Sequence, residues 1–214
     1  CAKTGQTVSA SDPSHYYGVT GLEVSKTATT TYTRTYTWGI DKSADGEYWK
    51  FIGEAPSTHS YTVAVERQAS DSAWAVSGEI TIKNTAPTGA TIEGVSDVVS
   101  DNISAKVECD VQFPYELKAG ETLTCKYSAS LPDASDRENT VTVTTSGPVP
   151  GGTGTAKVVF GAPTTVVGPA EVTISDDKTG ETWKASGSDS RRYSAEFSCP
   201  TDVTRYTDGV YSAP

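Results

Sequence analysis

The sequence predicts an all-β protein built from antiparallel sandwich modules. Ser and Thr make up roughly a quarter of the chain, Leu is scarce and Met is absent. Thr and Val are β-branched and favour strands. Apolar residues recur at every second position in many short segments. Turn residues separate these segments, which follow one another at intervals of about 8–15 residues, as strands do in antiparallel sandwiches.

The first predicted strand runs from Gly21 to Trp38. Tyr and Arg side chains alternate with Thr over residues 31–38, so that the aromatic residues share one face and the Thr residues the other. The Asp45-Gly46 pair is a hairpin signal that closes this strand.

Further alternating runs predict the strands that follow, and Gly, Pro and Asp residues supply the turns between them. In the first part of the chain these strands centre on 61–65, 80–82, 107–113, 123–127 and 141–143, with a further one near Ile92. In the last part they centre on 157–160, 172–174, 182–184 and 193–199.

A Gly- and Pro-rich stretch at 147–154 is the clearest linker signal in the sequence. It predicts three parts: an N-terminal extension at 1–20, a first module at 21–147 and a smaller second module at 153–214.

The second predicted module resembles a partial copy of the first. The Tyr-Ser-Ala run at 127–129 recurs at 193–195. The first copy then continues into a clean closing strand at 139–143, whereas the second reaches residue 214 without one. We therefore expect residues 2–11 to complete the second module, within one chain or between chains, through a candidate donor strand formed by Gln6, Thr7, Val8, Ser9, Ala10 and Ser11.

Several runs resemble an Ig-like repeat of bacterial surface proteins that is similar to pilin and adhesin stalk domains. They are Ile80–Ile92, Val95-Ser-Asp97, Leu117–Thr122 and Glu138–Val143, with a lead-in at Leu22–Ala28. The resemblance implies two Ig-like antiparallel β-sandwich modules, the second incomplete at its C-terminal strand. It also implies an extracellular spacer, adhesive or polymer subunit.

The four cysteines predict an oxidising compartment. Cys109 and Cys125 lie on inward-facing positions of their predicted strands and are expected to form a disulfide. Cys1 and Cys199 remain, and can pair within a chain or between chains. The alternative for Cys1, at the start of a chain that resembles a mature product, is lipid modification.

Pilin-type Ig domains often carry an amide crosslink between a Lys and an Asn, which a buried carboxylate assists. The resemblance places Lys26 or Lys42 near the first strand and Asn139 at the start of the last one. The chemistry needs an apolar pocket that lowers the Lys pKa. Exposed lysines and an asparagine in a turn are the interpretation that the sequence alone favours.

Other site classes find little support in the sequence. The net charge of −10 disfavours a nucleic acid partner, and no apolar run approaches the length of a membrane span. No catalytic or metal-binding motif is recognisable, so we expect neither an enzyme nor a cofactor. Asn102 opens a glycosylation sequon.

These features together predict an extracellular structural subunit or stalk module of a surface fibre. Its expected partners are other copies of itself or neighbouring surface modules. A carbohydrate-binding or host-adhesion module is the alternative, because the Trp and Tyr residues can form a platform for glycans.

Overall fold

The computed structural model describes residues 20–177 and 179–211, and it is all-β. Its contacts divide the chain into two compact units. The first unit comprises the chain up to Thr31 together with Ala73–Ala162, and the second comprises Tyr32–Ser72 and Pro163–Pro214. This division differs from the predicted modules at 21–147 and 153–214, because the segment 32–72 groups with the C-terminal part of the chain.

Two long strands, β2 (Thr29–Ala44) and β3 (Ser57–Asn84), contribute to both units. The predicted strand at 21–38 is therefore two strands, β1 (Leu22–Lys26) and β2. The two strands expected near 61–65 and 80–82 are one, because residues 66–77 contain no Gly or Pro that would end β3.

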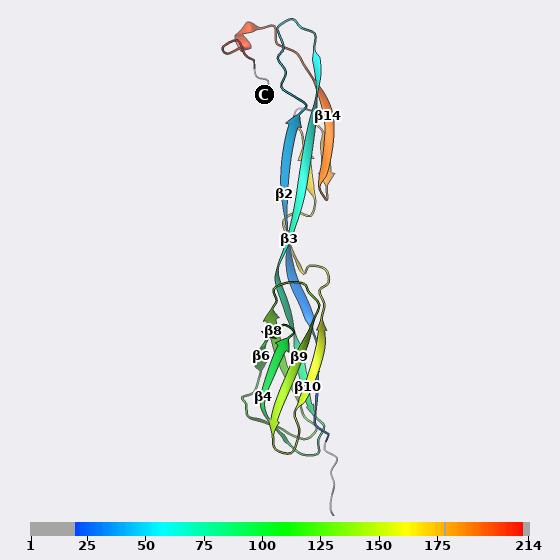
Figure 1. Ribbon diagram of the computed structural model, residues 1–214, viewed down its shortest axis with the longest axis vertical. Helices are drawn as coiled ribbons and strands as arrows, with labels where there is room; N and C mark the ends of the chain where they lie inside the picture. The colour runs from blue at the N-terminus through cyan, green and yellow to red at the C-terminus, as the bar shows by residue number, and fades with distance from the viewer. Residues whose placement is uncertain (1–19, 178, 212–214) are drawn as a thin grey trace, which may run out of the picture. The chain divides into compact units, whose positions relative to one another are not determined.

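The first unit has two antiparallel sheets (Figure 1). In one sheet, β1 and β8 (Thr122–Ser130) pair with β3, and β6 (Lys106–Cys109) pairs with β8. The other sheet has the order β10-β9-β4-β5, with β7 paired to β4. Its strands are β4 (Ala90–Val99), β5 (Ile103–Ser104), β7 (Tyr115–Leu117), β9 (Arg137–Ser146) and β10 (Gly152–Val158).

The core of the first unit lies between these sheets. Strand β8 buries every second residue, as the period of two in a strand requires. Its inward side chains join residues from the other sheet in one hydrophobic cluster, which includes Ile80, Ile82, Ile92, Leu123, Val141 and Val158. Packing between two sheets is the main stabilising contact of such a unit.

The linker expected at 147–154 is wrong. Strand β10 begins at Gly152 and pairs with β9 along its whole length. The glycines serve close approach of backbones rather than flexibility. A Cβ atom on Gly151 would lie 2.1 Å from the Val143 carbonyl oxygen, and one on Gly152 would lie 2.7 Å from that of Leu22.

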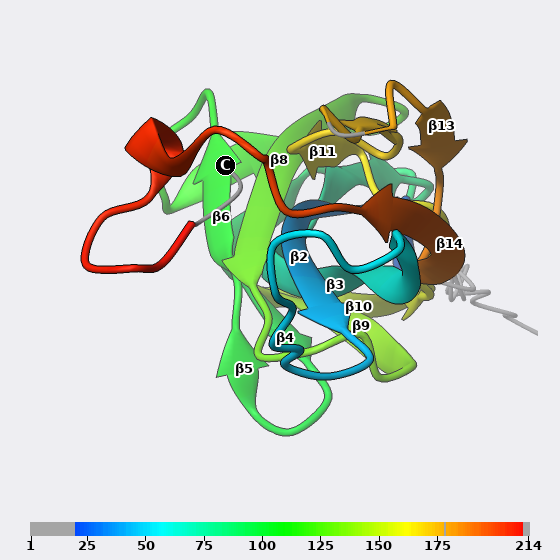
Figure 2. The same ribbon diagram turned by 90° about the horizontal axis from the view of Figure 1, so that it is seen from above.

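In the second unit, β2 and β14 (Asp189–Phe197) flank the first part of β3, and β11 (Thr165–Val167) pairs in parallel with β2. A separate hairpin consists of β12 (Val172–Ser175) and β13 (Thr182–Ala185); Figure 2 shows β13 and β14 from above. The buried cluster is small and consists of Val63, Val65, Ile174, Trp183 and Ala185.

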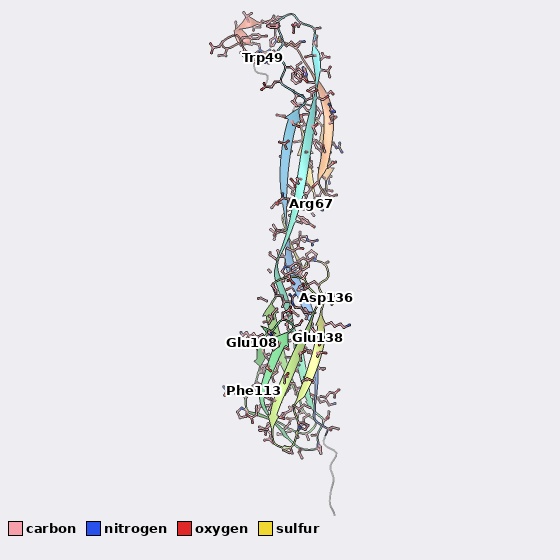
Figure 3. All side chains as sticks on the ribbon, in the orientation of Figure 1. Trp49, Arg67, Glu108, Phe113, Asp136 and Glu138 are labelled. Carbon is pink, nitrogen blue, oxygen red and sulfur yellow. A yellow bond between two sulfur atoms is a disulfide. The ribbon has the colours of Figure 1, made fainter. Side chains whose placement is uncertain are left out.

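The connection between β2 and β3 is longer than the two-residue hairpin expected at Asp45-Gly46. Strand β2 ends at Ala44, as the turn signal indicated, but β3 begins only at Ser57. The intervening loop carries Trp49, whose side chain extends from the ribbon (Figure 3). Among the described residues, no helix is long and apolar enough to cross a membrane.

Candidate functional site

Three buried polar side chains meet inside the first unit. Lys26 Nζ donates a hydrogen bond to Asp97 Oδ1, and Asn139 Nδ2 donates to Asp97 Oδ2 at 3.1 Å. The side chains of Lys26 and Asp97 have no exposed surface, and Asn139 is fully buried. One carboxyl group therefore holds the amine and the carboxamide beside each other.

Strand pairing brings these residues together from three parts of the sequence. Lys26 is the last residue of β1, opposite Ile80 of β3. Asp97 of β4 lies opposite Val141 of β9, two positions from the pair formed by Val99 and Asn139. Positions two apart in a strand face the same side, so Asp97 and Asn139 both point into the core.

Burial changes the chemistry of the amine. Loss of hydration lowers the pKa of Lys26, although its hydrogen bond to Asp97 opposes that effect. The Tyr127 ring lies 4.0 Å from Lys26 Nζ. Burial also raises the pKa of Tyr127, whose hydroxyl donates to the Thr27 carbonyl at 2.6 Å. An apolar pocket of this kind favours neutral groups over ions.

The carboxamide of Asn139 does not make all of its hydrogen bonds within the described part of the chain. Its Oδ1 atom is buried and accepts no hydrogen bond from the described part of the chain. An unsatisfied buried acceptor is costly and calls for an explanation.

The expectation of exposed lysines and a turn asparagine is therefore wrong for Lys26 and Asn139, which the structure buries together. Lys42 lies in the second unit, where it contacts Asp176. Sequence reasoning missed Asp97, the carboxyl group that contacts both Lys26 and Asn139. A signal was present, because Asp97 lies between Val95 and Val99 in the alternating inward set of β4.

The predicted disulfide is confirmed. Cys109 of β6 and Cys125 of β8 face each other in the strand register and are bonded. Cys199 carries a free thiol, and its Sγ donates to the Lys50 carbonyl. Cys1 and the candidate donor strand at 2–11 lie outside the described residues.

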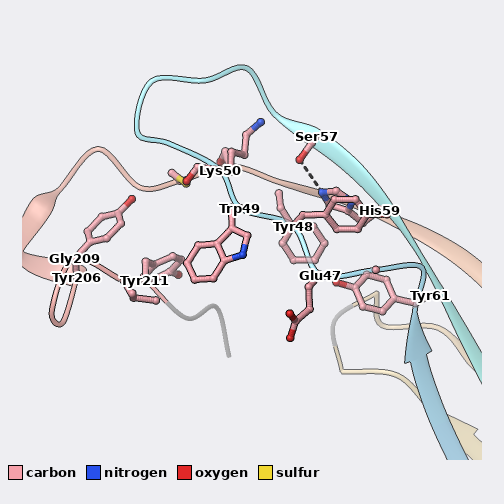
Figure 4. Close-up of a pocket in the computed structure, with 15 residues that line it drawn as sticks. Glu47, Tyr48, Trp49, Lys50, Ser57, His59, Tyr61, Tyr206, Gly209 and Tyr211 are labelled. Carbon is pink, nitrogen blue, oxygen red and sulfur yellow. Dashed lines mark hydrogen bonds between the residues drawn. The ribbon is translucent and has the colours of Figure 1, made fainter.

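An aromatic pocket of about 430 Å³ lies in the second unit, between the β2–β3 loop and the segment after β14 (Figure 4). Trp49 at this pocket is 83% exposed. The other three Trp residues pack in or against the two cores. The aromatic residues that line the pocket are Tyr48, Trp49, Tyr61, Phe197, Tyr206 and Tyr211.

The same pocket contains a hydrogen bond between Ser57 Oγ and His59 Nε2, at 2.8 Å (Figure 4). His59 lies on β3, and its ring stacks on that of Tyr48 with the two ring centroids 3.8 Å apart. In residues 20–177 and 179–211, no carboxylate is hydrogen-bonded to the other ring nitrogen to complete a catalytic triad.

Two further observations concern the remaining site classes. Asn102 lies exposed in the turn between β4 and β5, which leaves its sequon accessible. No group of three or more His, Cys, Asp or Glu side chains within the described chain is arranged to hold a metal ion.

Comparisons with family models, with curated proteins and with solved structures find no match for this chain. They therefore assign no family to this chain, and its likeness to an Ig-like surface repeat remains an expectation from the sequence.

Proposed function

We propose that this protein is an extracellular structural subunit or stalk module of a surface fibre, with Ig-like units, whose first unit crosslinks itself between Lys26 and Asn139. The buried contact of both residues with Asp97 carries this proposal. The crosslink would join β1 to β9, and these two strands lie in different sheets.

The reaction needs no external reagent. Proton transfer from the Lys26 ammonium to the Asp97 carboxylate leaves two neutral groups, which an apolar pocket favours. The amine then attacks Cγ of Asn139, while Asp97 donates its proton to the departing nitrogen and takes up the second proton that Nζ loses as the amide forms. The Nζ–Cγ bond forms, the Cγ–Nδ2 bond breaks, and ammonia leaves.

An extracellular location agrees with the disulfide between Cys109 and Cys125, since such bonds persist in oxidising compartments. Self-crosslinking suits a protein that bears load, because a covalent bond between strands cannot be pulled apart by unfolding.

Intact-mass spectrometry tests the crosslink. We expect a mass that is lower than the sequence mass by one ammonia, beyond the hydrogens lost in the disulfide. A tryptic peptide joining Lys26 to Asn139 should accompany the deficit. A full sequence mass after reduction would exclude the bond.

Assembly is proposed to proceed by strand addition, with residues 2–11 completing the second unit. Removal of residues 1–12 should abolish polymers seen by light scattering and negative-stain microscopy. Polymers that persist unchanged after this deletion would exclude strand addition.

The aromatic pocket favours a second candidate function, a glycan-binding module. Aromatic faces pack against the C–H groups of a sugar ring, and the pocket also holds the polar groups of Glu47 and Ser57. Titration with neutral oligosaccharides should change the Trp fluorescence of the protein. Trp49→Ala should abolish the change and Trp49→Phe should retain binding; the absence of any response across a glycan panel would remove this candidate.

A further inference from the structure

The second unit contains a Lys–Asp–Tyr group like the one in the first unit. Lys42 Nζ lies 2.9 Å from Asp176 Oδ2, and the Tyr193 hydroxyl donates to the same oxygen. Lys42 Nζ also lies 5.4 Å from the Tyr193 ring centroid. In the first unit, Lys26 contacts Asp97 and the Tyr127 ring in the same combination.

The strands that carry these residues correspond. Lys26 and Lys42 each lie on a strand that neighbours β3, on β1 and β2 respectively. Each Asp lies on or directly after a strand of the other sheet, β4 or β12. Each Tyr lies on β8 or β14, the strands that pair with β3. Along the chain, β12, β13 and β14 follow one another as β4, β7 and β8 do, although β5 and β6 lie between β4 and β7, and β4 pairs with β7 as β12 does with β13.

Strand β9 of the first unit is among those that have no counterpart in the described residues of the second. Strand β9, which carries Asn139, pairs with the edge of β4. The described part of the second unit pairs β12 only with β13. The group at Lys42 therefore has an amine and an acid, but it lacks the strand that would carry a carboxamide.

The exposure of the amine agrees with an incomplete site. The Lys42 side chain is 39% exposed, whereas that of Lys26 is fully buried, and Asp176 is 4% exposed. Hydrogen bonds with Tyr193 and Asp176 raise the pKa of Lys42, so the amine is protonated and unreactive. A strand laid over it would remove water and favour the neutral amine, as burial does at Lys26.

We propose that Lys42 is the amine of a second crosslinking site, which residues 2–11 of another copy complete by adding to the open edge of β12 and placing Gln6 beside Lys42. This inference rests on the strand addition proposed above. Gln6-Thr7-Val8 matches the Asn139-Thr140-Val141 run of β9, and Gln6 is the sole side-chain carboxamide in residues 1–19.

We assign the donation to another copy of the chain, and the mixing experiment below separates it from donation within one chain. Residues 2–11 precede β1 of the first unit, and the open edge belongs to the second unit. Donation between copies is a head-to-tail contact, which can repeat without closing on itself.

The covalent step balances without a further reactant. Lys42 passes a proton to Asp176 and attacks Cδ of Gln6. The Nζ–Cδ bond forms, the Cδ–Nε2 bond breaks, and Asp176 returns the proton to the departing nitrogen, which leaves as ammonia. The second proton that Nζ loses as it becomes an amide passes to Asp176, which ends protonated.

The test uses the full chain, boiled in detergent with reductant so that disulfides and non-covalent contacts are lost. We expect a ladder of covalent multimers and a peptide that joins Lys42 to Gln6. Lys42→Arg and Gln6→Ala should each remove the ladder, and Lys184→Arg, which changes an exposed Lys of the same unit, should retain it. Each variant should keep the mass deficit of the Lys26–Asn139 bond if the first unit crosslinks as proposed.

Mixing the two inactive variants tests whether the bond joins separate copies. The Lys42→Arg chain still supplies Gln6 and the Gln6→Ala chain still supplies Lys42, so the mixture should form covalent dimers and nothing longer. A Lys42–Gln6 bond within monomers, with no dimers on mixing, would overturn donation between copies. Polymers that need residues 2–11 but dissolve fully in detergent would overturn the crosslink and leave strand addition standing. Absence of polymers under all conditions would refute both.

Discussion

Tyr127 contacts the Lys26 region in two ways. The Lys26 amine lies 4.0 Å from the Tyr127 ring centroid, and the Tyr127 hydroxyl donates a hydrogen bond to the carbonyl of Thr27, the next residue after Lys26. The ring covers the Lys26 amine, and the hydroxyl holds the backbone of the residue that follows it. The two roles can be separated by a single substitution.

Tyr127→Phe should keep the mass deficit of the crosslink and lower the free energy of unfolding by about 1 kcal/mol, the usual net value of one hydrogen bond. Intact mass and urea unfolding measure the two effects. Loss of the deficit in this variant would mean that the hydroxyl takes part in the reaction.

Asp97→Ala should retain Lys26 and Asn139 but leave them unjoined, so that the protein has its full sequence mass. By the loop-closure argument used for disulfides, losing a link across so long a loop costs about 4–5 kcal/mol. Glu138→Ala is the matched control, because Glu138 is the exposed neighbour of Asn139 on β9 (Figure 3). A crosslinked Asp97→Ala protein would contradict the role of Asp97.

Replacing Cys109 and Cys125 with Ala should lower the free energy of unfolding by about 3 kcal/mol, because their bond closes a loop of moderate length. Reductant should lower the unfolding midpoint of the unmodified protein and leave that of the double variant unchanged. Cys199→Ser, at the free thiol, should behave as the unmodified protein does.

Gly151→Ala should destabilise the first unit by about 1–3 kcal/mol, the range of other overpacking substitutions. The new Cβ would lie 2.1 Å from the Val143 carbonyl oxygen, where neither backbone can retreat without breaking the β9–β10 pairing. Gly161→Ala is the control, because nothing lies within 4 Å of the corresponding position. Equal unfolding midpoints for the two variants would argue against close approach as the reason for Gly151.

Acid should remove a stabilising contribution of the loop before β9 over a defined pH range. Hydrogen bonds from Ser135 and then Arg137 lower the pKa of Asp133 to about 2, from about 3.9 in an unfolded chain. A lowered folded pKa stabilises the protein above the unfolded value, and this contribution is lost as the pH falls from about 4 to about 2. Acid unfolding of Asp133→Asn should lack that contribution, whereas Asp136→Asn should retain it.

The local periodicity of the sequence predicted much of the first unit and little of its connections. The alternation of β8 and the position of Cys125 follow from side-chain period alone. The continuity of β3 does not, because a strand that crosses two units has the same local pattern as two strands. Gly151 and Gly152 have the composition of a linker, and their close contacts exist only once β1, β9 and β10 have come together.

The sequence predicted the candidate site in part, as it did the fold. The resemblance named Lys26, Lys42 and Asn139 but could not choose between the lysines, since the choice depends on which strand reaches the carboxamide. The sequence also held a signal for Asp97, because an acid among inward-facing apolar positions of a strand is unusual.

The strand arrangement has a mechanical consequence once Lys26 and Asn139 are joined. The bond makes a closed ring of all the chain between them, which includes β2 and the whole of β3. Tension that enters before Lys26 and leaves after Asn139 would pass across the bond and bypass this ring. Roughly 380 Å of contour length would stay unextended, including residues 32–72 of the second unit.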